Sequence, residues 1–368
     1  MFVSRRRRSL RSAVRRALGA PFRLDRRDCP PGVAFELIGS HQPRLRSATI
    51  DGHDKAMAAF RAKQWHLRDF VATIRGPVLL DTALGWVVRG RDLIEVGNWS
   101  LVEQSPVVTK PSLLRWARAM IGARRVGPAA WLPFGAGNYW HFLNDMVAGL
   151  ALLNEGGALK DCVVLVPEEL AAKPFFKEVV ALSSLLSALE WQAYRPGRWL
   201  RAPMVQVAGT AFGSHATFRR AIALLDRLPP VTARPEQRLF ITRGEQAGRN
   251  PANLSVLVPE LERRGFEQVR FEGLSVVEQR ELVNSAAIVV AVHGAGMANL
   301  AFHEAPGQVK LLEITPADHL NPCFAFMAEE AGMDYFCFAG GPRDFADGER
   351  FEVPVAPFLD ALDRFVAR

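Results

Sequence analysis

The sequence predicts an α/β fold made of two domains that share a cleft. Across residues 237–339, apolar runs typical of strands alternate with segments of helical periodicity, which is the pattern of parallel strands covered by helices. The chain has 368 residues, more than one hydrophobic core usually serves. A polar segment with three prolines and no periodicity, residues 227–237, precedes the clearest alternation, and we expect it to be the hinge.

The first half begins with short β-rich segments and then alternates. Four short apolar runs separated by Gly, Asp and Pro lie within residues 32–105 and predict strands (VAFELIG, PVLLD, GWVVRG and LIEVGNW). The following elements are predicted in order: a helix at 112–121, a strand at 129–135, a helix at 138–157 closed by two glycines, a strand at 162–167, a helix at 174–189 and a strand at 190–195.

The second half has the more regular alternation. Its predicted strands are residues 238–243, 267–272, 287–293, 308–315 and 334–340, and its predicted helices are 253–264, 275–286, a start at 297–304, 323–332 and 356–367. Ser275 and Glu278 have the spacing of a capping box. This spacing predicts a Rossmann-like half with ligands outside the carboxyl ends of the strands.

The charge distribution argues against a nucleic-acid partner. The net charge is +8, and residues 1–28 contain ten arginines against two aspartates, which accounts for all of it. A neutral body with a basic tail favours a local electrostatic tether. In the tail, Leu10, Val14, Leu18 and Phe22 recur four apart, so a helix there would carry an apolar stripe suited to an anionic membrane surface. A solvated terminus is the alternative, and both stay open.

Hydropathy and cysteine usage place the protein in a reducing compartment. No run reaches the roughly 18 to 20 apolar residues of a spanning helix, and no apolar region of a secretory signal follows the arginines. Four widely spaced cysteines, with no C-x-x-C pair, indicate neither a zinc site nor a disulfide framework, and Cys162 and Cys337 are expected in the core. We expect a cytoplasmic protein, peripheral at the inner face of the membrane if the tail binds there.

Several candidate residues follow predicted strands. His293 closes one strand, and Gly294, Ala295 and Gly296 open the next helix, so bare amides at a helix N-terminus would suit a phosphate. A tight turn capped by histidine is the alternative. A dinucleotide fingerprint would need a glycine where Asn299 stands, so a nicotinamide site is a poor match.

Charged residues at the same predicted edge extend this hypothesis. Arg243 ends a strand and Arg249 lies six residues on, so the two are candidates for a clamp on a diphosphate, or ordinary surface arginines. Glu313 lies in an otherwise buried strand and needs a partner, either ribose hydroxyls or a neighbouring arginine. No D-x-D pair occurs, which favours neutralisation by protein groups rather than by a metal.

A candidate base lies in the first half. His141 and Asp145 are four apart, hence on one helix face, and Asn138 is a plausible cap of that helix. Facing a cleft, the pair would supply a general base. An ordinary helix-stabilising contact is the alternative.

Together these motifs resemble glycosyltransferase family 61. The resemblance rests on GNYWHFLND, LFITR…GRNPAN, GLSVVEQRELVNSAAIVVAVHGAGMANLAF and LLEITP, and it is strong over residues 129–315. It implies a GT-B-like fold with two Rossmann-like domains facing a cleft. We expect a basic tail at 1–28, an acceptor-side domain at 29–230, a nucleotide-sugar-binding domain at 231–345, and a C-terminal helix packing back at 346–368.

The resemblance also implies roles for individual residues. Arg243 and Arg249 would face the diphosphate, near His293 and the Gly294–Gly296 amides, and Asp145 would be the base, with His141 as its helper. Gln279 would lie on a helix near the site. Asn253 and Asn299 would either be structural or contact the donor. Glu313 is also a candidate for binding the donor. Leu254 departs from the acid that many members carry there, which leaves the donor sugar open.

The function expected from the resemblance is an inverting, metal-independent glycosyl transfer. The donor would be a nucleotide sugar, UDP-linked, and the acceptor a glycan or lipid-linked saccharide, with no cofactor. Two alternatives remain: a GT-B-like sugar-nucleotide epimerase, and a non-catalytic assembly protein that binds nucleotide or polysaccharide.

Overall fold

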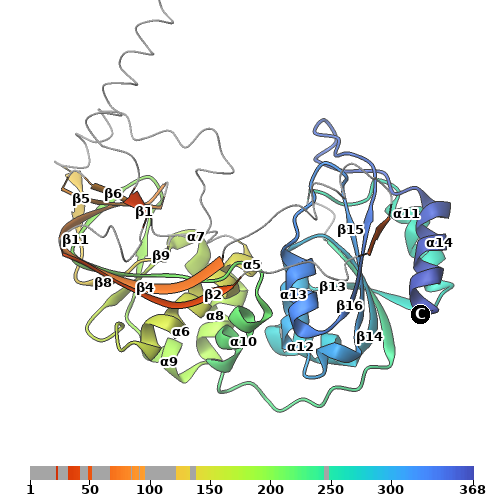
Figure 1. Cartoon of the computed structure of the whole chain (residues 1–368), viewed down its shortest axis with the longest axis horizontal. Helices are drawn as coiled ribbons and strands as arrows, with labels where there is room; N and C mark the ends of the chain where they lie inside the picture. Colours follow the sequence, from red (N-terminus) through yellow and green to blue (C-terminus); the bar gives the residue numbers. More distant parts are fainter. Residues whose placement is uncertain are drawn as a thin grey trace, which may run out of the picture.

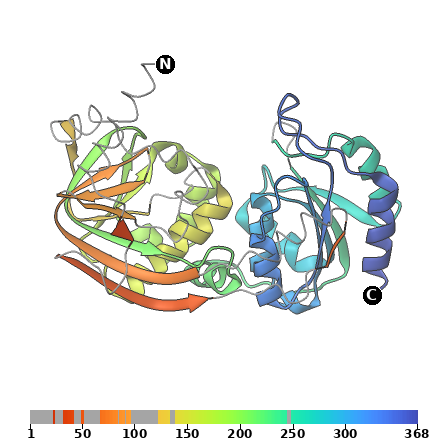
Figure 2. The same ribbon diagram turned by 45° about the horizontal axis from the view of Figure 1, so that its top comes forward.

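The chain folds into a mixed α/β structure with two sheets, as the alternation predicts (Figure 1, Figure 2). The computed structural model describes residues 22–23, 32–41, 49–51, 67–83, 85–90, 92–95, 122–132, 138–243 and 248–368. Most of the basic tail at 1–28 and the helix predicted at 112–121 lie outside these residues. Within the described ranges, no helix is long and apolar enough to cross a membrane.

The first sheet has ten strands and is only partly parallel. Its strands are β1 (Phe22–Arg23), β2 (Val33–His41), β4 (Leu67–Asp81), β5 (Trp86–Arg89), β6 (Asp92–Glu95), β7 (Arg124–Arg125), β8 (Ala129–Ala130), β9 (Val163–Pro167), β10 (Trp191–Tyr194) and β11 (Trp199–Gly209). The order is β1-β6-β5-β4-β11-β8-β9-β10, with β2 on β4 and β7 on β11.

The long strand β11 explains why this half differs from the expected Rossmann-like domain. It pairs antiparallel with β4 on one side and parallel with β8 on the other. The strands predicted from the alternation at residues 129–195 therefore form only one parallel part of this sheet, β8-β9-β10. The sequence analysis did not predict β11, and the strand expected at 129–135 is reduced to Ala129–Ala130. A GT-B arrangement of two Rossmann-like domains stays a prediction.

The second sheet is parallel throughout and confirms the five predicted strands. It contains β12 (Gln237–Thr242), β13 (Phe266–Arg270), β14 (Ala286–Val292), β15 (Lys310–Thr315) and β16 (Asp334–Ala339), with β3 (Thr49–Asp51) at the edge. The order is β13-β12-β14-β15-β16-β3. The next strand along the chain, β13, lies on one side of β12, and the one after it, β14, lies on the other. A crevice is therefore expected between the carboxyl ends of β12 and β14. The strand β3 belongs to the predicted 29–230 range, so a boundary at 230 does not separate the two sheets.

The helices agree with most of the predicted ones. They are α5 (Tyr139–His141), the π-helix η1 (Phe142–Val147), α6 (Ala148–Glu155), α7 (Glu168–Ala171), α8 (Pro174–Ala181), α9 (Ser184–Ala188), α10 (His215–Ala223), α11 (Leu254–Glu262), α12 (Val276–Ser285), the 3₁₀ helices η2 (Ala295–Phe302) and η3 (Pro306–Gln308), α13 (Cys323–Ala331) and α14 (Val355–Val366). The helix expected at 174–189 is two helices, because Ser183 caps the second one through Leu186 N. The predicted capping box of α12 is confirmed.

Helices cover both faces of the second sheet. α11 and α14 lie on its outer face, where Phe358 and Phe365 of α14 pack against Phe336 and Phe338 of β16 (Figure 1). The final helix therefore packs back on the body as predicted. α12 and α13 lie on the face toward the first half, where one hydrophobic cluster continues between the halves.

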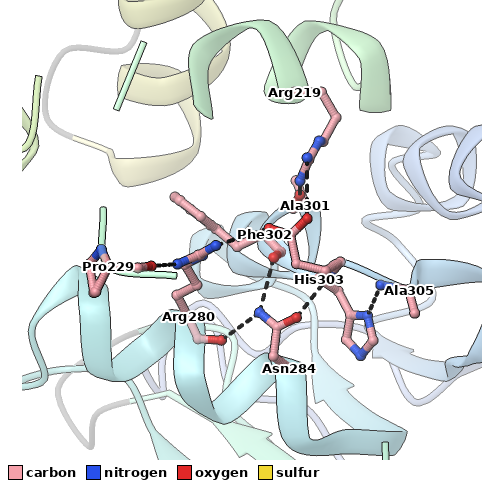
Figure 3. Close-up of polar contacts among 9 residues, drawn as sticks. Arg219, Pro229, Arg280, Asn284, Ala301, Phe302, His303 and Ala305 are labelled. Carbon is pink, nitrogen blue, oxygen red and sulfur yellow. Dashed lines mark hydrogen bonds and ion pairs between the residues drawn. The ribbon is translucent and has the colours of Figure 1, made fainter. Parts of the chain in front are cut away.

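The segment predicted as a hinge is irregular and is bonded to the second half. Figure 3 shows Arg280 of α12 donating to the carbonyl oxygen of Pro229, while its other nitrogen pairs with Glu304 at 3.0 Å. Arg219 of α10 donates to the carbonyl oxygen of Ala301 at 3.4 Å, and Asn284 donates to that of Phe302 at 3.0 Å. These contacts join α10, the predicted hinge segment at 227–237 and α12 at the end of η2.

Candidate functional site

The candidate site lies at the carboxyl ends of β12 and β14, where the strand order reverses. Arg243 is the first residue after β12 and His293 the first after β14. The guanidinium of Arg243 donates to the carbonyl oxygen of His293 at 3.1 Å, so the structure brings these two predicted residues together. A side chain at Gly294 would place its Cβ 3.3 Å from Arg243 Cδ, so the glycine leaves room for the arginine.

The HGAG turn has a different local structure from the one expected. Gly294 has an extended backbone with φ 177°, and the residues after it form the 3₁₀ helix η2 rather than an α-helix. Gly296 packs closely on Phe271, because an added Cβ would lie 3.0 Å from that ring. A 3₁₀ helix has poorer hydrogen-bond geometry than an α-helix. Ala295 and Gly296, at the start of this one, are half-buried.

Glu313 has partners that the sequence analysis did not foresee. It lies on β15, is 1% exposed, and one of its carboxylate oxygens bonds Nδ1 of His293. The other oxygen accepts the hydroxyl of Tyr335 on β16. Its partners in the structure are therefore His293 and Tyr335 rather than an arginine, and a contact of Glu313 with the donor stays a prediction. A carboxylate on Nδ1 fixes the orientation of an imidazole.

Two buried thiols lie near Glu313, and of these Cys337 was expected in the core. Cys323 and Cys337 are buried, and burial followed by the charge of Glu313 raises the pKa of both thiols well above the usual value. Cys162 is also buried, as predicted. In the described part of the chain, no group of three or more His, Cys, Asp or Glu side chains is arranged to hold a metal ion.

A second cationic group lies at the ends of β15 and β16. Arg249 donates through Nη1 to Nε2 of His319 at 2.9 Å, and the rings of His319 and His293 are 5.3 Å apart. Arg343 is fixed by Asp318, which accepts from its backbone N at 3.0 Å and from its Nε at 3.1 Å. His319 and Arg343 were missed, although each follows a predicted strand at the carboxyl edge.

The electrostatics of this group are those of an anion site. Burial lowers the pKa of His319 to about 4, helped by the charges of His293, Arg249 and Arg343, so this ring is neutral at neutral pH. Burial, and then the charge of Arg249, lowers the pKa of Arg243. Guanidinium groups stay protonated all the same, so the edge carries several positive charges that an anionic ligand would neutralise.

The predicted base pair lies on an irregular turn of helix. His141 Nδ1 and Asp145 Oδ2 are 2.7 Å apart, and the side chains are 20% and 18% exposed. Burial alone would lower the pKa of His141, but the hydrogen bond and charge of Asp145 outweigh it and raise the pKa above 6.5. Asn138 caps this helix as predicted, with Oδ1 accepting from Trp140 N at 2.9 Å.

The π-helix η1 explains how Asp145 is held. Asn144 is fully buried, and its amide nitrogen donates to Asp145 Oδ1 at 2.6 Å. Thr210 donates to the carbonyl oxygen of Asn144 at 2.8 Å, and Gly213 N donates to its side-chain oxygen at 3.2 Å. Such π-turns are often found at functional sites. Sequence periodicity does not distinguish this turn from an α-helix.

Aromatic rings and one hydrogen bond join the two parts of the site. Phe324 lies against Trp140, beside His141, with ring centres 4.6 Å apart, and against His293 with ring centres 5.2 Å apart. Tyr139 donates to the side-chain oxygen of Asn299 at 3.1 Å. The helix that carries Asp145 and the turn that follows His293 are therefore in direct contact.

Two predicted asparagines are structural residues. Asn299 is fully buried, and its amide nitrogen donates to Gln279 at 2.6 Å, so Gln279 packs near the site as expected. Asn253 bonds both the N–H and the carbonyl oxygen of Val353 with its side chain. These bonds to protein groups support the structural role of both asparagines, and their contact with the donor stays a prediction.

The fold and this edge define an α/β protein with a cluster of cationic side chains at the switch point of a parallel sheet. Residues 139–310 match the model of the family described as Glycosyltransferase 61. Residues 139–310 therefore form a glycosyltransferase family 61 domain, which makes the protein a glycosyltransferase. The match includes Asp145, Arg243 and His293, and ends before Glu313.

The other comparisons add no argument. No curated protein matches the sequence. Among solved structures, the flavodiiron protein from Giardia intestinalis aligns with 55% of this chain and 46% of its own length, at 9% identity and a TM-score of 0.21. That score is too low to support a statement about fold or function.

Proposed function

We propose that the protein transfers a sugar, with inversion and without a metal, from a UDP-linked nucleotide sugar to a glycan or lipid-linked saccharide. The observation that carries the proposal is that Phe324 packs both on Trp140, in the helix of the histidine–aspartate pair, and on His293 at the cationic sheet edge. The edge would hold the donor diphosphate, and the pair would activate the acceptor. The reversal of strand order between β12 and β14 supports binding of a nucleotide there, because sheets of this kind bind ligands at such a point.

The transfer needs a proton acceptor. The oxygen of an acceptor hydroxyl attacks the anomeric carbon of the donor, and its proton leaves to a base as the new bond forms. Both oxygens of Asp145 already bond His141 and Asn144. In this proposal, Nε2 of His141 receives the proton and Asp145 stabilises the resulting imidazolium, as in other histidine–carboxylate pairs.

The leaving group needs positive charge. As the bond from the anomeric carbon to the diphosphate oxygen breaks, the electron pair goes to the diphosphate, whose charge grows in the transition state. Arg243, Arg249 and the amides of Ala295 and Gly296 would neutralise it. Because arginine side chains supply this charge, the reaction should persist in the presence of a chelator.

The proposal is tested by transfer assays on the purified protein. Thermal shifts against a panel of nucleotide sugars identify the donor, because a ligand that binds only the native state raises the melting temperature. NMR of the product then gives the anomeric configuration; inversion supports the proposal, and retention contradicts it. An isomerised nucleotide sugar formed without nucleotide release would instead establish an epimerase.

The basic segment at residues 1–28 is proposed to hold the enzyme at an anionic membrane surface, beside a lipid-linked acceptor. The support is its charge of +8 and its apolar spacing. Co-sedimentation of the full chain with anionic vesicles, and not with neutral ones, is the expected result. Equal binding to both kinds of vesicle would remove this part of the proposal.

A further inference from the structure

The loop between β16 and α14 turns back to the cationic edge. Asp344 and Arg350 pair across a tight turn, and the Glu349 N–H donates to the carbonyl oxygen of Asp344 at 2.8 Å. Phe351, just after the turn, bonds the loop that carries Arg249, with its carbonyl oxygen accepting from Ala252 N at 2.8 Å. This turn therefore has a fixed place beside Arg249.

The carboxylate of Glu349 lies between two arginines. Its Oε2 is 3.4 Å from Nη1 of Arg343 and 4.0 Å from Nε of Arg249. Glu349 and Arg249 also share a left-handed backbone, with φ of 64° and 66°. Non-glycine residues rarely adopt this conformation, and it is concentrated at ligand sites and switch regions.

Arg343 is already positioned for an anion. Asp318 holds its backbone N and its Nε, and its guanidinium lies 4.8 Å from the ring centre of the exposed Phe345. Its Nη1 is the atom directed to Glu349. A guanidinium held in this way offers a preorganised donor to a phosphate.

The pairing of Glu349 with the arginines is weak enough to be exchanged. Its side chain is 41% exposed, and the two distances of 3.4 and 4.0 Å are long for ion pairs. Exposed pairs of this kind contribute little to stability. A diphosphate carries more charge and more acceptor oxygens, so it makes stronger charge-assisted hydrogen bonds with the same arginines.

We propose that Arg343 and Arg249 form the outer part of the donor-diphosphate site, and that Glu349 occupies it as an internal anion until the diphosphate displaces it. This inference rests on the proposed function of the edge. It adds Arg343 to the binding residues and gives Glu349 a role in release. The carboxylate of Glu349 returns to the arginines as the nucleotide diphosphate product leaves. It therefore competes with the product for the arginines and shortens the residence time of the product on the enzyme.

The test compares Glu349→Gln with Asp347→Asn. Both variants remove one negative charge from the same turn, but only the first removes the carboxylate beside the arginines. Calorimetry with UDP and with pyrophosphate should show roughly three- to tenfold tighter binding of both ligands to Glu349→Gln, and a gain that shrinks as salt is added. Asp347→Asn should stay within about twofold of the parent.

A double variant checks that the effect passes through Arg343. In the Arg343→Gln background, the added Glu349→Gln change should give a smaller gain than in the parent, because the nearer of the two arginine partners of the carboxylate is gone. If Glu349→Gln binds UDP and pyrophosphate no better than the parent while Arg249→Gln weakens both, the internal-anion role is wrong and the proposed function stands. If neither the parent nor Glu349→Gln binds either ligand, both proposals fail.

Discussion

The carboxylate of Glu313 bonds Nδ1 of His293 from the neighbouring strand, so the histidine at the switch point is held by a buried acid. The strands β14 and β15 are in parallel register, with Val292 beside Ile314, and His293 N donates to the carbonyl oxygen of Ile314 at 2.8 Å. Backbone and side chain thus fix the ring together. Tyr335 completes this unit from the next strand.

Glu313→Gln should slow turnover more than it changes donor KM. The amide keeps the shape of the side chain but loses the charge that holds His293, and small losses of positioning cost on the order of tenfold to a hundredfold in rate. Tyr335→Phe is the matched comparison, because it leaves the charge in place. It should lower thermal stability by about 1–2 kcal/mol, since a buried oxygen loses its donor, with a smaller effect on kcat. Equal kcat losses in both variants would contradict a special role of the charge.

Asp145→Asn should keep donor binding and lose turnover by roughly a hundredfold or more. The amide no longer stabilises the charged imidazole of His141. Because Asp145 raises the pKa of His141, the acidic limb of the kcat profile lies above pH 6.5 in the parent and should move to lower pH in any residual activity of the variant. A pH profile of kcat measures this shift. An acidic limb that does not move would show that the His141–Asp145 pair is not the base.

The same shift predicts a small stability effect with a definite sign. A histidine whose folded pKa is raised, as that of His141 is, contributes stability that is fully present below its unfolded pKa of 6.5 and is lost as pH rises through the folded pKa.

His319 has the opposite behaviour. Its folded pKa of about 4 lies below 6.5, so protonation favours unfolding as pH falls from 6.5 towards 4. Melting temperatures of His319→Gln across this window should fall less steeply than those of the parent, and parallel curves would contradict the shift.

Tyr139→Phe should uncouple the two parts of the site. The change removes the hydrogen bond to Asn299 and leaves a fully buried amide oxygen without its donor, at a cost of about 1–3 kcal/mol. Tyr194→Phe, at a buried tyrosine of the first sheet, is the control for the loss of a tyrosine hydroxyl. We expect a fall in kcat for Tyr139→Phe alone. A similar kcat loss in both variants would show only a general effect of destabilisation.

Glu330→Gln should weaken the contact between the halves. This side chain on α13 accepts hydrogen bonds from His215 N at 2.7 Å and Ser214 Oγ at 3.2 Å, so it caps α10 of the other half. Loss of a charged cap costs about 0.5–2 kcal/mol. Urea unfolding should detect the loss in Glu330→Gln and leave Glu281→Gln, an exposed glutamate on α12, unchanged. Equal stability of both variants would contradict the capping role.

Much of the second half could be predicted because its information is local. The alternation that places β12 and β14 and the capping box at Ser275 are patterns within a few residues, and so is the spacing of His141 and Asp145 in the first half. Since parallel strands end at one edge, Arg243 and His293 could be expected there together, and they bond at 3.1 Å. Their roles as donor ligands remain proposals.

The partners of buried groups could not be read in this way. The hydrogen-bond partners of Glu313, His293 and Tyr335, lie 20 and 22 positions away in the sequence. The side-chain oxygen of Asn299 accepts a hydrogen bond from Tyr139, 160 positions away. The π-turn at Asn144 bonds Thr210, the residue after β11, a strand that local pattern did not reveal. Each of these contacts is created by packing and has no counterpart in local periodicity.

The sequence by itself determined the α/β class, the parallel second sheet and the edge at which its charged residues gather, because hydrophobic periodicity and strand direction are local properties of the chain. The tertiary structure decided that β3 crosses to the second sheet, that His319 and Arg343 join the cationic edge, and that Glu349 stands between two arginines. These depend on which strand ends and loops are brought together by burial of the shared core, and only the folded chain determines that.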